Sequence, residues 1–518
     1  MNYREGLVSL THDKLIRAAA SKRPYKEALV DIETREIITY KELWLRSNKI
    51  ANILIDLSLK KGDKIGTLGY ECAEFPVIWL GIMKMGGVKI GLNWRYTARE
   101  MEDVINRSDT KAIIIGEAFI DFIMKFKDTL TNIKHYIVIG DNVPEGMISY
   151  KDYLSQASDK DPNVEIKAED MCALFFTTGT TSAPKAAIRC HSDYVAAIFL
   201  YCWAWHYHPQ MKELNCLPDF HIGGHYMIDG TLYVGGTSYV GRFNPEQFLK
   251  IIDNEKISYT TLPPTMMGLL IALPDNIKSR YDCSSVKCIG SGGSVYSAAI
   301  KDISKQIFPN AELHDAYNAT EVGVTVVEPE DFEHYGCVGE PMIGMEVKIF
   351  NRKREELPPG TEGLIYTRGP SRITGYYKDL EAMEKCIIRD PTGDWFTLED
   401  MGYIHPVTNL LYITGREKDI IITGDENVSP AEVEGVISNH FAVSEVSVLG
   451  ISDKKWGEQV VAVIRVKEEY NLSEKDIKAY CKQNLAGFKI PKTFKFVEEV
   501  LPRKGFKIDR NLVRDKYF

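Results

Sequence analysis

Residues 175–191 read FFTTGTTSAPKAAIRCH, and this stretch decides how the rest of the chain is interpreted. The apolar residues 174–176 predict the end of a buried strand, and the small hydroxylated residues behind them predict a loop. Backbone N–H groups, hydroxyls and the Lys185 ammonium would then face one space, which is the chemistry of a polyphosphate site. The P-loop pattern does not fit, because Lys185 follows Pro184 and has no glycine beside it. The stretch predicts a phosphate site of another kind or, alternatively, a polar surface loop.

The size and composition of the chain restrict its class. With 518 residues it is longer than one hydrophobic core usually supports, so two or more domains are expected. Hydrophobic residues make up 44% and charged residues 26%, which is typical of a soluble globular protein. The 63 basic and 72 acidic side chains give a formal net charge of −9 without a long basic block, which argues against a nucleic-acid partner.

The cysteines and the apolar segments indicate a cytoplasmic protein. The ten cysteines are scattered without a C-x-x-C pair, which predicts reduced thiols and no zinc site. Residues 1–14 lack the basic and apolar regions of a signal peptide. The most apolar window, residues 75–94, is interrupted by Lys84, Lys89 and several glycines, so no membrane span is expected.

Strand-like and helix-like segments alternate along most of the chain. Residues 38–57 carry Thr39 and Glu42 at capping-box spacing, followed by apolar residues at helical period, which predicts a helix. The runs 111–116 and 135–140 are β-branched and closed by glycine, as is typical of fully buried strands. This alternation indicates parallel, doubly wound sheets.

The pattern changes toward the C-terminus. Residues 360–370 and 410–416 predict antiparallel strands with glycine turns. Beyond Arg416, helices are expected to begin at the capping residues Ser429 and Ser473. This last part of the chain is therefore expected to form a small α+β domain.

Further polar clusters occur where loops should follow strands: GSGGS (290–294), YNATE (317–321), DWFTLEDMGY (394–403), YITGREKDIIITGDENVSPAEVE (412–434) and LPRKGFKIDR (501–510). Together with TTGTTSAPK they resemble, in order and approximate spacing, the core motifs of the adenylate-forming superfamily. That superfamily includes acyl-CoA synthetases, peptide-synthetase adenylation domains and luciferases. The TTSxPK form and NLAGFKIP (484–491) look most similar to crotonobetaine and carnitine CoA ligases and to medium- and long-chain fatty acyl-CoA ligases.

The resemblance covers nearly the whole chain and implies an architecture and a reaction. The fold would be α/β, with an N-terminal AMP-binding domain, residues 1–415, of doubly wound sheets and a small β-barrel-like subdomain. A small, mobile α+β domain, residues 416–518, would swing about a hinge near Lys418. The family attacks the α-phosphate of ATP with a carboxylate, releases pyrophosphate, and then lets a thiol displace AMP. ATP, Mg²⁺ and CoA are therefore expected to take part.

The resemblance also implies roles for residues at matching motif positions. The β- and γ-phosphates would be held by Thr177, Thr178, Gly179, Thr180, Thr181, Ser182 and Lys185. The adenine and ribose would be bound by Gly292, Gly293, Ser294, Tyr317, Asp400 and Arg416. Thr320 would contact the α-phosphate, Glu321 would bind Mg²⁺, and Lys507 would be the catalytic lysine of adenylation. The pantetheine tunnel would be lined by Gly424, Glu426 and Asn427.

Several positions depart from the family pattern, but none of them removes a charged catalytic group. Glycine is usual at the positions of Ser182, Ala186, Asn318, Glu399 and Asp425. The C-terminal motif PRKGFK is one residue shorter than usual. Lys504 therefore remains an alternative to Lys507 as the catalytic lysine.

The acyl pocket is expected near His221 in PDFHIGGH (218–225) and near Ser291, where the small residues 290–292 would leave depth for a chain or ring. The expected acid is a fatty acid or a crotonobetaine- or carnitine-like acid.

An aromatic cage for a quaternary ammonium group is one hypothesis for this pocket. Trp203 and Tyr207 would share one helical face and could form such a cage together with Tyr226. Ordinary core aromatics are the alternative interpretation.

Two features of the sequence bear on the identity of the thiol acceptor. Every charged catalytic position is filled and no carrier-protein domain follows the C-terminal unit, which favours a free-standing CoA ligase. An adenylating enzyme that loads a carrier protein, or a binding protein without turnover, remain alternatives. The expected partners are a small carboxylic acid, ATP and CoA, and the chain could form a homodimer.

Overall fold

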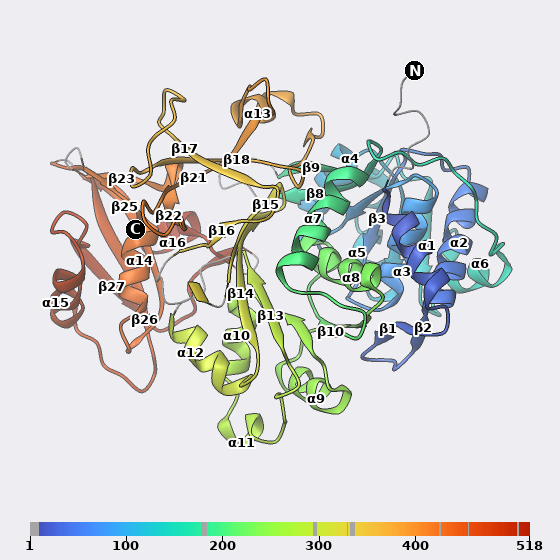
Figure 1. The fold of residues 1–518 in the computed structure, drawn as a ribbon, viewed down its shortest axis with the longest axis horizontal. Coiled ribbons are helices and arrows are strands. Elements are labelled where there is room, and N and C mark those ends of the chain that lie inside the picture. The colour runs from blue at the N-terminus through green and yellow to red at the C-terminus, as the bar shows by residue number, and fades with distance from the viewer. Residues whose placement is uncertain are drawn as a thin grey trace.

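A computed structural model of the chain describes residues 10–177, 184–293, 298–328, 330–331, 337–423, 426–453, 455–504 and 507–518 (Figure 1). The described strands form four sheets of five or more strands and one two-stranded hairpin. No helix among the described residues is both long enough and apolar enough to cross a lipid bilayer. All ten cysteines are unpaired thiols, as the sequence predicts, and all except Cys72 are buried.

The first sheet has eight strands and a parallel centre. In sheet order its strands are β19 (Gly375–Tyr376), β9 (Lys185–Cys190), β8 (Met171–Thr177), β4 (Val88–Gly91), β3 (Lys64–Leu68), β5 (Thr110–Gly116), β6 (His135–Ile139) and β7 (Ile148–Ser149). The β-branched runs at 111–116 and 135–140 pair in parallel here, as their sequence predicts. The strands β8, β9 and β19 pair antiparallel and form one edge.

The second sheet has nine strands and the same mixed character. In order they are β16 (Glu340–Pro341), β15 (Val322–Val327), β14 (Glu312–Ala319), β13 (Cys288–Gly292), β12 (Tyr259–Thr261), β10 (Lys212–Asn215), β11 (Thr237–Val240), β1 (Glu27–Asp31) and β2 (Ile37–Thr39). The central strands from β14 to β1 pair in parallel, and both edges pair antiparallel. The two sheets therefore bear out the expected doubly wound α/β fold.

Helices cover these two sheets and separate them. They are α1 (His12–Lys22), α2 (Tyr40–Asp56), α3 (Glu74–Lys84), α4 (Ala98–Arg107), η1 (Glu117–Phe119), α5 (Ile120–Met124), η2 (Lys127–Thr129), α6 (Tyr150–Gln156), α7 (His191–Ala204), α8 (Ile222–Val234), α9 (Pro245–Glu255), α10 (Pro264–Ile271), α11 (Asp275–Lys278) and α12 (Ala298–Ile307). The predicted capping box is present at α2, where Thr39 Oγ1 accepts from Glu42 N and the Glu42 carboxylate accepts from Thr39 N.

The layer between the two sheets contains α7 and α8. One hydrophobic cluster joins Phe175 of the first sheet to Cys288 of the second through Tyr201 of α7 and Met227 of α8. Burial of these side chains from both sheets supplies the hydrophobic stabilisation that holds the sheets together. Side chains on the inward faces of α7 and α8 are therefore candidates to line any site between the sheets.

The third sheet has five antiparallel strands in an open order. They are β17 (Glu346–Phe350), β18 (Gly363–Arg368), β21 (Trp395–Ile404), β20 (Ile387–Ile388) and β22 (Leu411–Arg416), with β22 beside β21 and α13 (Leu380–Lys385) in a connection. Residues 394–403 were expected to form a loop, but most of them lie in β21. Burial on both faces explains the difference, because the consecutive residues Trp395 and Phe396 point to opposite faces of the strand and pack in two different hydrophobic clusters.

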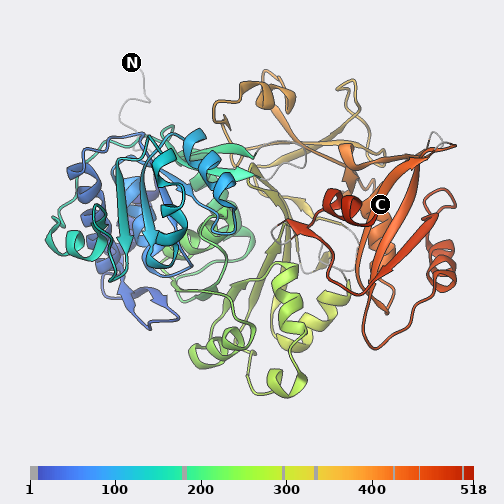
Figure 2. The same ribbon diagram turned by 180° about the vertical axis from the view of Figure 1, so that it is seen from behind.

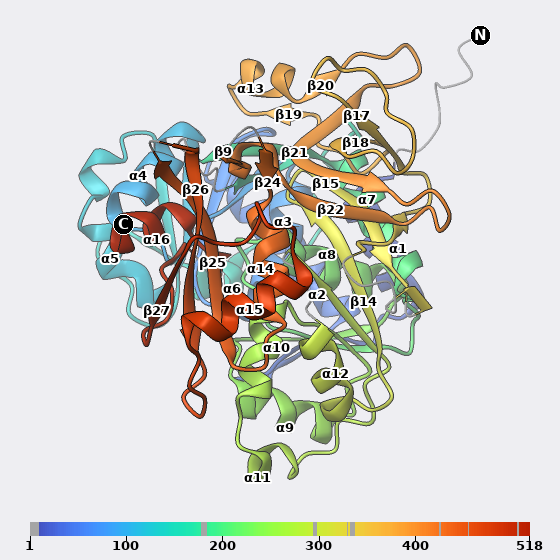
Figure 3. The same ribbon diagram turned by 90° about the vertical axis from the view of Figure 1, so that its left-hand side faces the viewer.

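The C-terminal unit is small and mixed, as expected. Its sheet contains β24 (Glu426–Val428), β23 (Ile421–Thr423), β26 (Gly457–Val466), β25 (Val443–Asp453) and β27 (Thr493–Val497), with the hairpin β28 (Arg503–Lys504) and β29 (Lys507–Ile508). Its helices are α14 (Pro430–Ser438), α15 (Glu474–Asn484) and α16 (Arg510–Tyr517). Figures 1 and 2 show this unit at one end of the molecule, and Figure 3 shows it facing the viewer. The domain boundary at residue 415 and the mobility of the C-terminal unit stay predictions.

Candidate active site

The predicted site residues Thr320 and Glu321 form the turn between β14 and β15. The segment just before β19, the edge strand of the first sheet, meets this turn, because Ile373 N donates to the Glu321 carbonyl oxygen at 2.8 Å. The Tyr376 hydroxyl donates to Glu321 Oε1 at 3.0 Å, and Lys185 Nζ lies 5.0 Å from the Tyr376 ring centroid. Tyr376 thus brings the predicted metal-binding carboxylate and the predicted phosphate-binding lysine to one place.

Thr177 and Lys185 lie at the two ends of the predicted phosphate loop. Thr177 ends β8, Lys185 begins β9, and the two residues are opposite each other in register. Thr177 Oγ1 donates to the Lys185 carbonyl oxygen at 3.4 Å. The residues between them that were predicted to bind phosphate, Thr178, Gly179, Thr180, Thr181 and Ser182, lie outside the described residues.

A second group contains Tyr317, Asp400 and Arg416. The Tyr317 hydroxyl donates to Asp400 Oδ2 at 2.7 Å, and Arg416 Nε donates to Asp400 Oδ1 at 2.9 Å. Burial, followed by the nearby Asp400 carboxylate, raises the pKa of Tyr317 well above its ordinary value, so the phenol keeps its proton and donates. A buried carboxylate held from both sides in this way is fixed in orientation.

Close backbone approach explains the glycines of β13. A Cβ atom on Gly292 would lie 2.9 Å from the Ala316 carbonyl oxygen and 3.0 Å from Asn318 Nδ2, so no larger residue fits. Gly293 has a φ of +81°, which favours glycine. Ser294, the third residue predicted here, lies outside the described residues.

Glu399 occupies a glycine position of the family pattern and keeps the backbone shape of glycine. Its φ is +64°, in the left-handed region. Lys418, the predicted hinge residue, lies in the short helix η4 (Glu417–Asp419), and its Nζ is 3.8 Å from Glu399 Oε2. The departure at Glu399 therefore leaves Asp400 in place and puts a carboxylate beside the predicted hinge.

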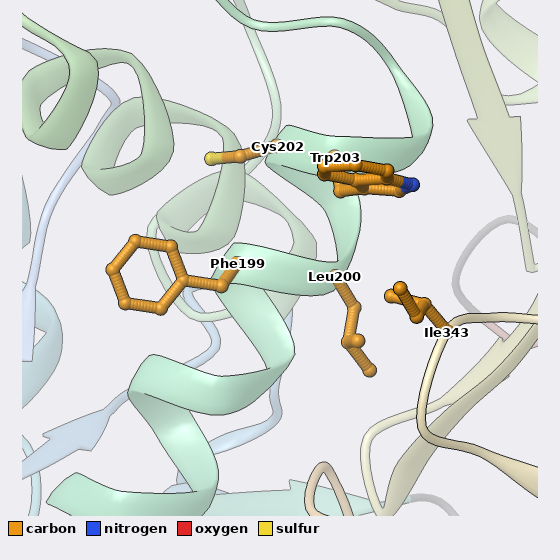
Figure 4. A pocket seen from close by; sticks show the side chains of 5 residues that line it. All are labelled: Phe199, Leu200, Cys202, Trp203 and Ile343. Atoms are coloured by element: carbon orange, nitrogen blue, oxygen red, sulfur yellow. The ribbon is translucent and has the colours of Figure 1, made fainter.

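The aromatic cage expected from Trp203, Tyr207 and Tyr226 does not assemble. Trp203 is 69% exposed and lines a shallow surface hollow with Phe199 and Ile343 (Figure 4). The expected shared helical face fails because α7 ends at Ala204 and His206 adopts a left-handed φ of +52°.

Tyr207 instead packs into the core, with its hydroxyl 3.2 Å from Met227 Sδ and its ring 5.5 Å from that of Tyr259. Tyr226 is also buried in this core. Both residues therefore fit the alternative interpretation, ordinary core aromatics.

The other two residues predicted for the substrate pocket, His221 and Ser291, stay predictions. His221 is the exposed N-cap residue of α8, with its ring 4.6 Å from that of Phe220. Alternation along β13 puts Ser291 on the face of Ile289, which packs with α9 and α10. The depth expected behind Gly290 is filled, because a Cβ there would lie 2.4 Å from the Trp205 ring.

Arg189 was not singled out from the sequence, although it lies directly behind the Thr320 turn. Its side chain has no exposed surface, and Nη2 donates to the Thr320 carbonyl oxygen at 2.7 Å. Nη1 donates to Asp193 Oδ1 at 2.8 Å and to the Ser371 carbonyl oxygen at 2.6 Å. The available signal was an arginine inside the apolar run AAIRC, with an aspartate four residues later.

A buried ion pair lies under the PDFHIGGH segment and was also missed. Lys89 Nζ contacts Asp219 Oδ1 at 2.6 Å and His225 Nε2 at 2.7 Å, and Thr67 Oγ1 donates to Asp219 Oδ2 at 2.9 Å. Burial alone would raise the pKa of Asp219, but Lys89 and His225 outweigh this effect and lower it. The segment that carries His221 is thereby tied to β3 and β4 of the first sheet.

Residues predicted in the C-terminal unit are less completely described. Glu426 is exposed in β24, whereas Gly424 and the side chain of Asn427 lie outside the described residues. Lys504 and Lys507 are paired across the hairpin β28–β29, and their side chains likewise lie outside what is described. Arg510, at the start of α16, donates to Asp419 at 2.8 Å and to Glu434 at 2.6 Å.

Glu321 is compatible with a magnesium ion bound chiefly by a nucleotide. Within the described ranges, no group of three or more His, Cys, Asp or Glu side chains could enclose a metal ion. Mg²⁺ commonly takes only one or two protein carboxylates together with substrate phosphates and water. Of the two Glu321 oxygens, Oε1 accepts from Tyr376, and that contact orients the carboxylate.

Comparison with known proteins agrees with this geometry. The sequence profile of the AMP-binding enzymes matches residues 16–377, and that of the AMP-binding enzyme C-terminal domain matches residues 432–505. The fatty acid–[acyl-carrier-protein] ligase ScoC of Streptomyces coeruleorubidus is 27% identical, over 93% of this chain and 92% of its own. The mitochondrial medium-chain acyl-CoA ligase ACSF2 of Danio rerio is 26% identical, over 98% of this chain and 89% of its own. The crystal structure of ATP-bound MatB from Rhodopseudomonas palustris superimposes with a TM-score of 0.87 at 25% identity, covering 98% of this chain and 99% of MatB.

Proposed function

The chain belongs to the AMP-binding enzyme family, and from this premise we propose that it is an ATP-dependent, AMP-forming carboxylic acid:CoA ligase. A carboxylate oxygen of the acid attacks the α-phosphorus of ATP, and the bond to pyrophosphate breaks. The CoA thiol then loses its proton, attacks the acyl carbon and displaces AMP. The observation that carries this proposal is the meeting of Lys185, Tyr376 and Glu321 beside the Thr320 turn.

In the first step, one group of side chains is proposed to bind the phosphates of ATP and another to bind the ribose. Lys185 is a positive charge at the end of the phosphate loop, suited to the β- and γ-phosphates. Asp400 can accept both ribose hydroxyls, and Arg416 and Tyr317 hold its carboxylate in place. Mg²⁺, when bound at Glu321, would neutralise part of the phosphate charge.

CoA is the proposed acceptor, and a carrier protein is the second candidate. The similarity to ScoC, whose name states a carrier-protein acceptor, favours keeping that candidate. The similarity to ACSF2, whose name states a CoA ligase, supports CoA.

The direct test measures ATP-dependent AMP formation over a panel of carboxylic acids, with and without CoA. The panel includes fatty acids and crotonobetaine and carnitine, the substrates that the resemblance suggests. Multiple turnovers that require CoA would support the proposal. A single burst of pyrophosphate that CoA does not extend, but that a carrier protein does, would favour the second candidate. Binding of ATP without any pyrophosphate release would indicate a binding protein.

Replacing Asp400 by asparagine should raise the KM for ATP by about tenfold to a hundredfold. A hydrogen bond to a charged group contributes about 1.5–3 kcal/mol, and asparagine keeps the shape of the side chain but loses the charge. Asp394→Asn is the matched control, because Asp394 pairs with the exposed Arg389 and should leave the KM unchanged. An unchanged KM for ATP in Asp400→Asn would show that Asp400 is structural only.

A further inference from the structure

A chain of polar side chains begins and ends at the Thr320 turn, and we call these four residues, Arg189, Tyr226, Tyr201 and Asn318, the polar wall. Arg189 donates to the Thr320 carbonyl oxygen at 2.7 Å, and its Cζ lies 5.7 Å from the Tyr226 ring centroid. The Tyr226 and Tyr201 rings are 5.8 Å apart. Asn318 Nδ2 donates to the Tyr201 hydroxyl at 2.9 Å, two residues before Thr320. The polar wall therefore lies beside the turn of Thr320, the residue predicted to contact the α-phosphate that the acid attacks.

Two donors of the polar wall are left without a partner. Arg189 Nε and Tyr226 Oη are both buried, and neither makes a hydrogen bond to any residue that the structure describes. A guanidinium nitrogen can only donate, so its missing partner must be an acceptor. A buried polar group without a partner costs about 1–3 kcal/mol, which a ligand oxygen could recover on binding.

The charge of the polar wall is already balanced. Asp193 accepts from Arg189 Nη1 at 2.8 Å, and both side chains are almost fully buried. A second carboxylate on the ligand would meet this neutral pair instead of a free cation, and its desolvation would not be compensated. The unpartnered donors therefore fit a neutral oxygen, such as a hydroxyl or a ketone.

Two side chains fill the space against the glycines of β13 near the polar wall, where the Trp205 ring lies 5.1 Å from that of Tyr201. Trp205 occupies the depth behind Gly290, where a Cβ would lie 2.4 Å from its ring. Asn318, at a position where the family pattern has glycine, closes in on Gly292, with Nδ2 3.0 Å from a Cβ placed there. A long alkyl chain that ran past Gly290 and Gly292 would have to displace one of these two side chains.

We propose that the acid activated by this enzyme is compact and carries a neutral oxygen acceptor, as a hydroxy or keto acid does, which Tyr226 and Arg189 bind. This inference rests on the proposed ligase function and names its substrate class. A plain fatty acid and crotonobetaine both lack such an acceptor and would leave the two donors unpaired, whereas the hydroxyl of carnitine would supply one.

The test compares matched acids as substrates of the full-length enzyme. Acid-dependent pyrophosphate release is measured with β-hydroxybutyrate against butyrate, with levulinate against pentanoate, and with decanoate as the long plain chain. The kcat/KM for at least one oxygenated acid should exceed that of its plain partner by about tenfold or more, because sites with buried donors reject analogues that lack the acceptor. Decanoate should be the poorest substrate.

Tyr226→Phe keeps the ring and removes only the unpartnered hydroxyl. The preference for the oxygenated acid should fall toward unity, whereas the Tm of the ligand-free protein should not fall, because the lost hydroxyl had no partner. Tyr40→Phe is the matched control, since its buried hydroxyl donates to the carbonyl oxygens of Leu232 and Gly236. It should lower the Tm and keep the preference. Asn318→Gly should raise the activity with decanoate.

The outcomes separate this inference from the function on which it rests. Equal use of plain and oxygenated acids, unaffected by Tyr226→Phe, would overturn the inference and leave the ligase function standing. If neither these acids nor any acid of the wider panel gives pyrophosphate release, both the inference and the ligase function are overturned. A reduced preference in Tyr40→Phe as large as in Tyr226→Phe would also count against the polar wall, because packing alone would then explain the effect.

Discussion

Replacing Glu321 by glutamine should reduce acid-dependent pyrophosphate release by about two to three orders of magnitude, the scale for losing one positioned electrostatic group. Glutamine has the shape of glutamate but no charge, so the side chain proposed to hold Mg²⁺ would lose its affinity for the ion. The fold should survive, because the glutamine oxygen can still accept from the Tyr376 hydroxyl, which lies 3.0 Å from Glu321 Oε1. The measurement is single-turnover pyrophosphate release, together with the Mg²⁺ dependence of ATP binding.

Two controls separate charge from packing in this experiment. Glu340→Gln removes an exposed carboxylate in β16 and should change neither rate nor Tm. Tyr376→Phe removes the hydroxyl that orients Glu321 but keeps the carboxylate, so its loss of rate should be smaller than that of Glu321→Gln. If Glu321→Gln keeps activity within about tenfold of the wild type, the carboxylate does not carry the role proposed for it.

The fold was predictable where local signals and tertiary packing agree. Thr39 and Glu42 form the capping box that their spacing predicts, and the β-branched run 111–116 is a buried parallel strand. The sequence was misleading at Trp203, because extending the helical period past Ala204 ignored the end of α7. Helix ends depend on backbone changes such as the left-handed His206, which apolar periodicity does not reveal.

The site residues that the sequence predicts come from short motifs, and the structure brings several of them together. Thr320 with Glu321, and Asp400 with Arg416, are found from such motifs, and Asp400 and Arg416 are direct partners across β21 and β22. Tyr376 and Arg189 could not be found in this way, because their roles arise from contacts between segments far apart in the chain. A tyrosine next to another tyrosine has no distinguishing sequence pattern, and the arginine in AAIRC signals at most its ion pair with Asp193, not its contact with Thr320.

Lys507→Ala should reduce adenylation by about 10² to 10³ and spare thioester formation from a ready-made acyl adenylate. Adenylation needs a cation beside the α-phosphate as pyrophosphate leaves, whereas the second step needs only access for the thiol. The two half-reactions can be followed separately, by single-turnover pyrophosphate release and by CoA consumption from synthetic acyl adenylate. Lys418→Pro restricts the backbone at the predicted hinge and should instead impair thioester formation more.

Contacts in the C-terminal unit connect the predicted catalytic lysine to the predicted hinge. Arg510, at the start of α16, is three residues beyond Lys507 and donates to Asp419, the neighbour of Lys418, at 2.8 Å. It also binds both oxygens of Glu434 in α14, so the hairpin with Lys507 is tied to the segment just after the hinge. Any rotation at Lys418 would then carry the hairpin with it, as the predicted exchange between the two half-reactions requires.

Lys504 is the decisive comparison, because the backbone does not distinguish the two lysines. They stand opposite each other in the register of β28 and β29. Lys504→Ala should keep both half-reactions if Lys507 is the adenylation lysine. Loss of adenylation in Lys504→Ala, with a normal rate in Lys507→Ala, would mean that the shortened PRKGFK motif has moved the catalytic cation to the other strand of the hairpin. Arg510 follows the hairpin whichever of the two lysines is catalytic. Lys418→Pro should therefore have the same effect under both assignments. Its effect tests the predicted mobile domain separately from the choice of lysine.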